Sequence, residues 1–212
     1  VGFAATFPWS RARKLAGKTA NLSAPGSSMY SHWTFDVLPR ARLLEERGHP
    51  MSSFDNVVIF TRNPTFGFHG QGLAAIGVRP EQVVVVTDGD PVFEIEHLVE
   101  PSDVRTGYYA APSVYAEVRR LFAGGPAPNT PAELIFLGRK NTNKRTVLNM
   151  DDVQPVLDRF GFATVYAEDW PIREFARIMN AARVIVGPHG AGLSNIVFCE
   201  PHARVMELYG PH

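Results

Sequence analysis

Short runs of apolar residues recur along this sequence, and segments with the spacing of amphipathic helices separate most of them. The runs that we expect to be strands are Val57–Phe60, Val83–Val86, Val92–Val99, Leu134–Leu137, Ala163–Tyr166, Val184–Val186 and Val205–Leu208. Helical spacing is clearest in Ser113–Phe122. Strands that are apolar throughout and alternate with helices are typical of parallel sheets with both faces covered. The sequence therefore predicts an α/β fold.

A segment rich in proline and glycine, residues 124–131, divides the chain. Such a segment cannot continue a helix or a central strand. We predict two Rossmann-like halves, residues 30–125 and residues 132–212, that face each other across a cleft. Residues 1–29 lack a clear apolar period, and we interpret them as an irregular lead-in. The sequence starts with Val1 rather than methionine, so we interpret it as a piece of a longer chain.

The charge balance of the chain limits the kinds of partner. Among its 212 residues, 21 Lys and Arg residues balance 21 Asp and Glu residues, for a formal net charge of zero. Nucleic acids and anionic membranes select proteins with a basic excess, so neither is an expected partner. No apolar run approaches the ~18 residues that a transmembrane segment needs. Cys199 is the only cysteine, which excludes an internal disulfide and a thiolate metal cluster.

The segment Val184–Leu193 has the pattern of a strand, a tight turn and the start of a helix. In parallel α/β sheets such a turn lies at the carboxyl edge, where ligands bind. Gly190 and Gly192 have no Cβ, so a ligand can approach the backbone there, and the amides at the start of a helix suit a diphosphate. The alternative is a turn in which the glycines serve packing alone. The loop by itself leaves both interpretations open.

Motifs in one order along the chain resemble those of glycosyltransferase family 61. In the C-terminal half they are Arg139, Arg145, Asn149, Gly161–Phe162, Val184–Gly187, His189–Leu193, Asn195, Phe198 and Glu207–Leu208. In the N-terminal half they are His32–Trp33, Asp36, Leu38–Arg40 and Ile76–Val78. Two positions depart from the family pattern, because Met150 stands where a glutamate is usual and Phe175 where a glutamine is usual.

The resemblance implies a GT-B transferase that moves a sugar from a UDP-sugar donor to a hydroxyl of a glycan or polysaccharide, with inversion and without a metal. It implies that the C-terminal half binds the nucleotide sugar and that the N-terminal half lies on the acceptor side. Members of the family transfer xylose, arabinose or N-acetylglucosamine. The donor sugar, the linkage and the oligomeric state stay open. The arginine-rich, cysteine-poor composition favours a bacterial cytoplasmic enzyme over one of the ER or Golgi lumen.

Loss of UDP from a sugar requires positive charge beside the diphosphate. Arg139, Lys144 and Arg145 follow a strand of the C-terminal half, and an arginine fork binds phosphate oxygens in pairs. We also assign to the nucleotide-sugar site His189, Gly190, Ala191, Gly192 and Asn195. Glu207 ends the last expected strand, where an acid can accept hydrogen bonds from ribose hydroxyls. For each charged residue, the alternative is a solvated charge.

Deprotonation of an acceptor hydroxyl requires a base. His32, Asp36 and Arg40 follow one another at intervals of four residues, so they share one face of a continuous helix. We assign the base to His32 or Asp36 and leave open which of them takes the proton. The alternative is an exposed polar face with an Asp36–Arg40 ion pair. Pro39 must kink this helix or start a second one.

Asp88-Gly89-Asp90 suggests a different mechanism, because paired carboxylates at a strand end can hold a divalent cation on a nucleotide sugar. Asp-Gly is also a strong turn signal, so we interpret the segment as a hairpin between Val83–Thr87 and Val92–Glu96. In line with what the family resemblance implies, we expect no metal and no other cofactor. The alternatives are a metal-dependent transferase that uses Asp88 and Asp90, and a non-catalytic module that binds a nucleotide or a carbohydrate.

Overall fold

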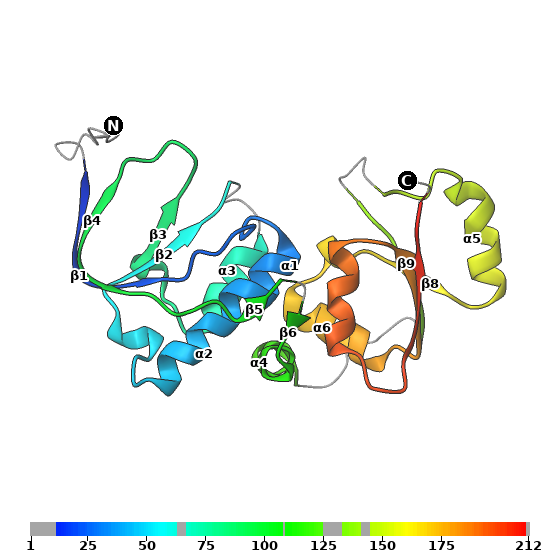
Figure 1. Cartoon of the computed structure of the whole chain (residues 1–212). Helices are drawn as coiled ribbons and strands as arrows, with labels where there is room; N and C mark the ends of the chain where they lie inside the picture. The colour runs from blue at the N-terminus through cyan, green and yellow to red at the C-terminus, as the bar shows by residue number, and fades with distance from the viewer. Residues whose placement is uncertain (1–11, 63–66, 108, 125–132, 141–144, 211–212) are drawn as a thin grey trace. The chain divides into compact units, whose positions relative to one another are not determined.

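A computed structural model describes residues 12–62, 67–107, 109–124, 133–140 and 145–210. The chain divides into two compact units (Figure 1). The first contains Val1–Ser28 and His32–Ala110, and the second contains Met29–Ser31 and Ala111–His212. The boundary therefore precedes α4 (Pro112–Phe122), which groups with the second unit, whereas we predicted it at the proline-rich segment that follows this helix.

The first unit is built on a parallel sheet of four strands in the order β3-β2-β1-β4. The strands are β1 (Arg13–Asn21), β2 (Asn56–Phe60), β3 (Val83–Val86) and β4 (Phe93–Val99). The last three confirm predicted apolar runs. The prediction of an irregular lead-in is wrong for Arg13–Asn21, an inner strand of this sheet. Only Leu15, Thr19 and Ala20 of β1 are buried, and the polar residues between them hide the period of the strand.

Strand β1 is irregular at Gly17. The pairing of β1 with β4 shifts register between Leu15 and Lys18, and Gly17 has a φ of 78°. Bulged strands bend, and a left-handed φ favours glycine. A Cβ at Gly17 would also collide with the Asp55 carboxylate, which accepts a hydrogen bond from the Lys18 amide at 2.7 Å. The start of β1 remains part of the core, because Leu15 packs in one apolar cluster with Val58 of β2.

The hairpin predicted around Asp88-Gly89-Asp90 is wrong. β3 and β4 lie at opposite edges of the sheet, and all four strands are parallel. The Asp-Gly signal marks a local turn, in which Asp90 Oδ2 accepts hydrogen bonds from the amide of Thr87 at 2.5 Å and from its hydroxyl at 2.9 Å. These bonds lower the pKa of Asp90. Turn chemistry is local, whereas the pairing of strands depends on the whole sheet.

One helical segment follows β1 and carries the residues that we assigned to the base. It begins as α1 (Tyr30–His32), widens into the π-helical turn η2 (Trp33–Val37) and continues as α2 (Leu38–Glu46). Pro39 lies in the first turn of α2, directly after the π-helical turn. The sequence predicted that Pro39 would kink the helix or start a second one, and the structure places it where the π-helical turn passes into α2. Single π-helical turns occur often at functional sites.

The other elements of the first unit are shorter. They are α3 (Gly67–Ala75), the 3₁₀ turns η3 (Met51–Ser53) and η4 (Pro80–Gln82), and the antiparallel pair of β5 (Arg105–Thr106) with β6 (Tyr109–Ala110). α3 packs so closely against η2 that a Cβ at Gly72 would collide with the buried Trp33 ring. The ring of His69 also meets Trp33 edge to face, with centroids 4.6 Å apart.

Arg40 joins two loops at the carboxyl edge of the first sheet. It is 3% exposed. Its guanidinium donates to the carbonyl of Ser23, which follows β1, and to that of Pro101, which follows β4, the latter at 2.5 Å. Burial lowers the pKa of Arg40, and the Asp103 carboxylate opposes that shift. The guanidinium is directed to these carbonyls, so the Asp36–Arg40 pair of the exposed-face interpretation does not form.

The second unit is built on a parallel sheet of four strands in the order β10-β9-β7-β8. The strands are β7 (Leu134–Leu137), β8 (Ala163–Val165), β9 (Val184–Pro188) and β10 (Arg204–Leu208). All four confirm predicted runs. The helices that accompany α4 are α5 (Met150–Arg159), α6 (Ile172–Ala181), η5 (Ala167–Asp169) and η6 (Ala191–Phe198). Figure 1 shows α5 beside β8, and α4 and α6 both pack against η6.

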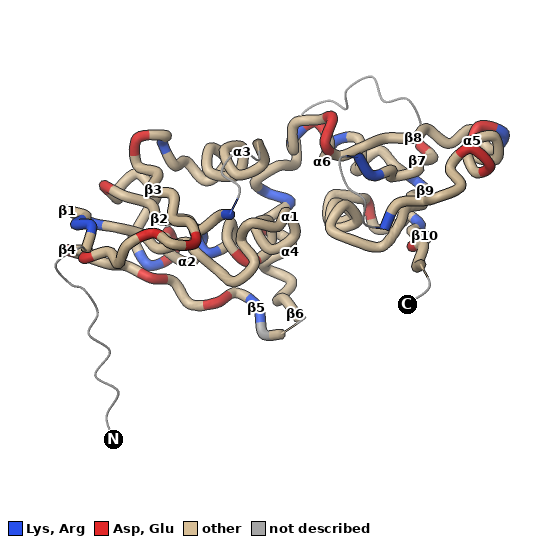
Figure 2. The backbone as a smooth tube through the Cα atoms, turned by 90° about the horizontal axis from the view of Figure 1, so that it is seen from above, with Lys and Arg blue, Asp and Glu red and all other residues tan. Residues whose placement is uncertain are grey.

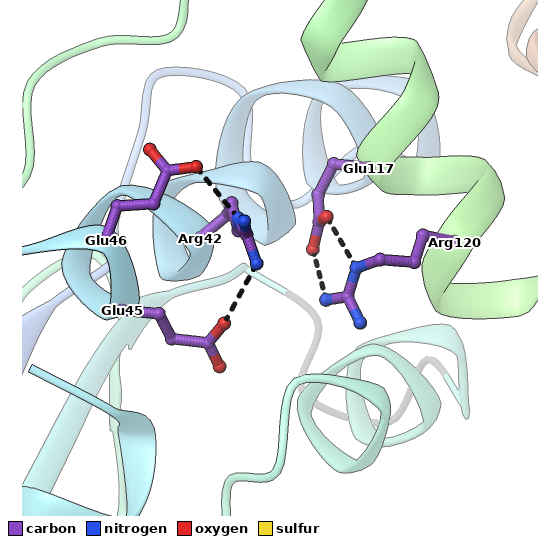
Figure 3. Close-up of polar contacts among 5 residues, drawn as sticks. All are labelled: Arg42, Glu45, Glu46, Glu117 and Arg120. Atoms are coloured by element: carbon purple, nitrogen blue, oxygen red, sulfur yellow. Dashed lines mark hydrogen bonds and ion pairs between the residues drawn. The ribbon is translucent and has the colours of Figure 1, made fainter.

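Positive and negative residues are interspersed along both units, in keeping with the net charge of zero (Figure 2). Many pair at the surface, as Arg42 of α2 does with Glu46 at 2.9 Å (Figure 3). Such exposed pairs contribute little to stability. No helix in the described part of the chain is long and apolar enough to cross a membrane.

Arg40→Ala removes the donor shared by two carbonyls and is expected to lower the free energy of unfolding by about 2–4 kcal/mol. Arg42→Ala is the matched control on the same helix, because Arg42 makes only exposed pairs with Glu45 and Glu46 (Figure 3). It is expected to cost less than about 1 kcal/mol. Urea denaturation followed by circular dichroism measures both. Equal losses in the two variants would contradict the joining role of Arg40.

Candidate functional site

The strand order of the second sheet creates a crevice at its carboxyl edge. β7 lies between β8 and β9, so the chain leaves β7 toward one edge of the sheet and leaves β9 toward the other. The loops after β7 and β9 therefore separate, and open α/β sheets bind ligands where this happens. The β7 loop starts at Gly138, and the β9 loop is the glycine loop.

Two arginines of the β7 loop converge on the glycine loop. A Cβ built on Gly190 would collide with Nη1 of Arg139 and would lie 3.1 Å from Nη1 of Arg145. Gly190 has a φ of 144°, so its backbone and the two guanidinium groups both require glycine. Arg139 Nη1 donates to the His189 carbonyl at 3.2 Å. Arg145 has a φ of 57°, a strained conformation of the kind that clusters at functional sites.

The positive charge of these two arginines is not neutralised within the described part of the second unit. Neither Arg139 nor Arg145 forms an ion pair with a carboxylate among the described residues. Lys140, next to Arg139, pairs with Asp169 at 2.5 Å. Two guanidinium groups that share one loop without a carboxylate form an anion site, and their planar forks match the oxygens of a phosphate.

Backbone amides lie beside the same arginines. Helix η6 starts after Gly190, and its first 3₁₀ bond is donated by the Leu193 amide to the Gly190 carbonyl at 3.0 Å. The amides of Ala191 and Gly192 come before that bond, so neither has an acceptor within the helix, as is usual for the first amides of a helix. The helix that we predicted to follow the glycine loop is a 3₁₀ helix. Its free amides and its dipole end still favour an anion.

Asn195 supports the glycine loop from inside the unit. It is 1% exposed. Its Nδ2 donates to the Gly192 carbonyl at 2.8 Å, and its Oδ1 accepts a hydrogen bond from the Tyr30 hydroxyl at 2.6 Å. The side chain is buried, and both of these bonds lie within the second unit. The structure therefore shows Asn195 holding the loop in shape, and its assignment to the nucleotide-sugar site stays a prediction.

His189, Glu207 and Tyr209 form an exposed cluster beside the glycine loop. His189 Nδ1 lies 2.6 Å from Glu207 Oε1, and the Tyr209 hydroxyl donates to Glu207 Oε2 at 2.8 Å. The rings of His189 and Tyr209 stack with centroids 4.9 Å apart. The hydrogen bond from His189, followed by that from Tyr209, lowers the pKa of Glu207, which in turn raises the pKa of Tyr209. Glu207 thus orients the imidazole, a role beyond the predicted contact with ribose.

In the first sheet the loops after β1 and β4 lie together at the carboxyl edge, where Arg40 binds both. His32 and Asp36 come from the helical segment that follows β1. His32 Nδ1 lies 2.6 Å from Asp36 Oδ2, so the predicted spacing of one turn does bring the imidazole and the carboxylate together. The side chains are 33% and 14% exposed, respectively, which leaves the imidazole the more accessible of the two.

Arg105, on the strand β5 that follows β4, completes this cluster. Its Nε lies 2.8 Å from Asp36 Oδ1, and its Nη2 donates to Asp36 Oδ2 at 2.8 Å. Nη2 also lies 3.2 Å from His32 Nδ1. Sequence reasoning missed Arg105, because 69 residues separate it from Asp36 and no local spacing relates the two.

Other candidates lie elsewhere. Lys144 is outside the described residues. Asp88 pairs with Arg62 at 2.6 Å, and Asp90 is bound to Thr87, so each carboxylate has its own partner. No group of three or more His, Cys, Asp or Glu side chains among the described residues is placed to hold a metal ion. A pocket of about 470 Å³ in the first unit is lined mainly by apolar side chains such as Phe60, and none of the assigned residues lines it.

The family model for glycosyltransferase 61 matches residues 30–206 of this chain. The chain belongs to glycosyltransferase family 61. The match includes His32, Asp36 and Arg105 of the first unit, and Arg139, Arg145 and the glycine loop of the second. Glu207 and Tyr209 lie just beyond it. It confirms the family resemblance that the motifs carry.

Curated relatives from plants and animals match shorter segments. Alpha-1,3-arabinosyltransferase XAT3 of Oryza sativa subsp. japonica is 34% identical over 87 residues, which are 40% of this chain and 15% of that protein. The beta-1,2-xylosyltransferase XAX1 of the same plant is 31% identical over 85 residues, with the same coverage. The EGF domain-specific O-linked N-acetylglucosamine transferase of Mus musculus is 28% identical over 109 residues, or 49% of this chain and 20% of that protein. The chain thus covers a fifth or less of each of these relatives.

The sequence did not reveal the contacts that Arg119 makes with the end of η6 or that Tyr209 makes with Glu207. Arg119 of α4 donates to the carbonyls of Val197 and Cys199 at 2.8 and 2.7 Å, and so fixes the end of η6. Tyr209 follows the Glu-Leu motif directly, and that proximity to Glu207 was the only available signal. Burial raises the pKa of the Cys199 thiol to about 11, which agrees with the structural role expected for the single cysteine.

Glu207→Gln is expected to lower the pKa of Tyr209 toward its ordinary value. In the wild-type protein, loss of the phenol proton would place a phenolate against the Glu207 carboxylate, so the pKa of Tyr209 is raised. A neutral amide removes that repulsion. Tyrosinate absorbance, with Tyr209→Phe subtracted, measures the titration of this one side chain. An unchanged titration in Glu207→Gln would mean that the two side chains do not meet in solution.

Proposed function

We propose that this chain carries the donor-binding and acceptor-activating groups of an inverting, metal-independent glycosyltransferase. In this proposal, a sugar moves from a UDP-sugar to a hydroxyl of a glycan or polysaccharide, and the two units are the halves of a GT-B enzyme. Family membership supports the reaction class. The arabinosyl-, xylosyl- and N-acetylglucosaminyltransferases among the relatives favour a pentose or N-acetylglucosamine as the transferred sugar.

The observation that carries the proposal is the convergence of Arg139 and Arg145 on Gly190. Both arginines keep a positive charge that no described carboxylate neutralises, and they lie at the place where an open α/β sheet binds its ligand. The diphosphate of a nucleotide sugar supplies the missing negative charge. As the bond to the sugar breaks, negative charge grows on the leaving diphosphate, and fixed guanidinium groups stabilise that charge without a metal.

In an inverting transfer, the acceptor oxygen forms a bond to the anomeric carbon while the bond from that carbon to the phosphate oxygen breaks. The acceptor proton passes to a base, and the electrons of the broken bond leave with UDP. The paired His32 and Asp36 side chains supply that base in the proposal, because they are the imidazole and carboxylate that the helical segment after β1 brings together.

The metal-dependent alternative would assign the cation to Asp88 and Asp90. The present contacts of these two side chains disfavour it, because Arg62 and Thr87 occupy the oxygens that a cation would need. A transfer assay in EDTA separates the two mechanisms. We expect the rate to be unchanged, and loss of transfer that added Mg²⁺ or Mn²⁺ restores would favour the metal-dependent alternative.

Arg139→Ala and Arg145→Ala are each expected to weaken binding of UDP at least tenfold, which corresponds to ~1.4 kcal/mol. The physical reason is that each variant removes one of the two forks that hold the diphosphate. Isothermal titration calorimetry with UDP, and then with GDP, CMP and dTDP as competitors, measures the effect and tests the choice of nucleotide.

Arg183→Ala is the matched control for these variants. Arg183 lies at the amino end of β9, at the opposite edge of the same sheet, where it pairs with Glu133 at 3.1 Å. Its loss is expected to leave the UDP affinity unchanged. Wild-type affinity in both Arg139→Ala and Arg145→Ala would remove the phosphate assignment. UDP binding without transfer to any of a broad set of acceptors would favour a non-catalytic binding module.

A further inference from the structure

The Asp36 carboxylate is already bound within the cluster. Its Oδ2 accepts a hydrogen bond from Arg105 Nη2 at 2.8 Å and lies 2.6 Å from His32 Nδ1. Its Oδ1 lies 2.8 Å from Arg105 Nε as an ion pair, is buried, and forms no hydrogen bond among the described residues. An acceptor hydroxyl therefore reaches neither oxygen of Asp36 unless the cluster opens.

The same contacts indicate which ring nitrogen of His32 carries the proton. Two contacts compete for His32 Nδ1, because Asp36 Oδ2 at 2.6 Å needs a proton there and Arg105 Nη2 at 3.2 Å needs a lone pair there. We assign the proton to Nδ1 because the contact with Asp36 is much the shorter, so the approach of Arg105 Nη2 to Nδ1 is not a hydrogen bond. In a neutral imidazole the lone pair then resides on Nε2. Among the described residues, Nε2 of His32 has no hydrogen-bond partner. The nitrogen that can accept a proton is thus the one that the cluster leaves open.

Arg105 also balances the charge of the cluster. An uncompensated carboxylate beside an imidazole favours the protonated imidazolium, which cannot act as a base. With Arg105 in place, the carboxylate and the guanidinium cancel, and Asp36 can orient His32 without driving it to the charged form. The other charges in this region are Arg40 of α2, Glu100 and Asp103, and Arg40 and Glu100 lie 3.9 Å apart.

The backbone around Arg105 suits a positioning role. β5 pairs with β6 in antiparallel register, with Arg105 opposite Ala110. Upstream, the Pro101 carbonyl is bound by Arg40, which also binds the loop after β1. The segment that carries Arg105 is therefore anchored on both sides, and one of these anchors connects it to the segment that leads to His32.

We propose that Arg105 is a positioning residue that holds and neutralises Asp36, so that His32 Nε2 rather than Asp36 accepts the proton of the acceptor hydroxyl. This inference rests on the proposed function for its chemistry. As the acceptor oxygen bonds to the anomeric carbon, its proton moves to Nε2, and the diphosphate leaves with the electrons of the bond that it loses. Asp36 stays ionised and bound to Arg105 throughout.

The experiment compares Arg105→Gln, which removes the charge, with Arg105→Lys, which keeps the charge but loses the fork. Arg79→Gln is the control, because Arg79 also binds a carboxylate through Nε, that of Glu81 at 2.8 Å, on a distant exposed turn. Histidine-labelled protein is titrated by NMR without substrate, and His32→Gln identifies the His32 signal among the seven histidines. The pH dependence of kcat/KM and the affinity for UDP are measured on the same proteins.

In Arg105→Gln, the His32 titration and the acidic limb of the pH–rate profile are both expected to move to higher pH by about one unit or more, because the Asp36 charge is no longer balanced. kcat at neutral pH is expected to fall at least tenfold, with UDP affinity within about twofold of the wild type. Arg105→Lys is expected to restore the titration but not the full rate. Arg79→Gln is expected to match the wild type in every measurement.

A His32 titration that is the same in Arg105→Gln and in the wild type overturns the inference, whatever the rates. So does full activity of Arg105→Gln at all pH values. If the titration moves as expected but the wild-type protein transfers no sugar, the proposed function fails while the coupling between Arg105 and His32 stands. Because the NMR titration needs no substrate, the two failures are distinguishable.

Discussion

The parallel pairing of the strands decides where chemistry can take place in this chain. In the first sheet the loops after β1 and β4 meet at the carboxyl edge, and in the second sheet the loops after β7 and β9 leave toward opposite edges. At each of these places the carboxyl ends of neighbouring strands leave side chains and backbone amides together at one edge. The His32 cluster lies at the first, and the Gly190 loop lies at the second. Neither cluster is contiguous in the sequence, so each exists only because the sheet forms.

The arginines of the two units illustrate three ways in which a protein handles a guanidinium group. Arg40 is buried and donates to backbone carbonyls, so its charge supports the loops around it. Arg105 pairs with the Asp36 carboxylate, so its charge is balanced and its guanidinium holds that carboxylate in one orientation. Arg139 and Arg145 approach the backbone at Gly190 and pair with no carboxylate among the residues that the structure describes, so in our proposal their charge serves a ligand. The surroundings of each side chain, rather than its residue type, assign it a role.

The sequence predicts the strands that are apolar nearly throughout, because β3 and β7 contain no polar residue and β2 contains one only at its first position, Asn56. β1 is missed, since Lys14, Gly17 and Lys18 interrupt its period. The β3–β4 hairpin is wrong because Asp-Gly reports a turn and says nothing about which strands pair. The His32–Asp36 contact is predictable from a spacing of one helical turn, whereas Arg105 is not, because only the completed sheet brings it near.

Residues of the glycine-loop motif are required for two different reasons. Gly190 is required by its φ of 144° and by the guanidinium groups that lie where a Cβ would stand. Asn195 is required by its bonds to Tyr30 and to the Gly192 carbonyl, which fix the shape of the loop from within. Sequence similarity gives both residues equal weight, although only the first lies against the anion site. A motif therefore identifies a loop conformation first, and the residues that contact the ligand must be selected from it by geometry.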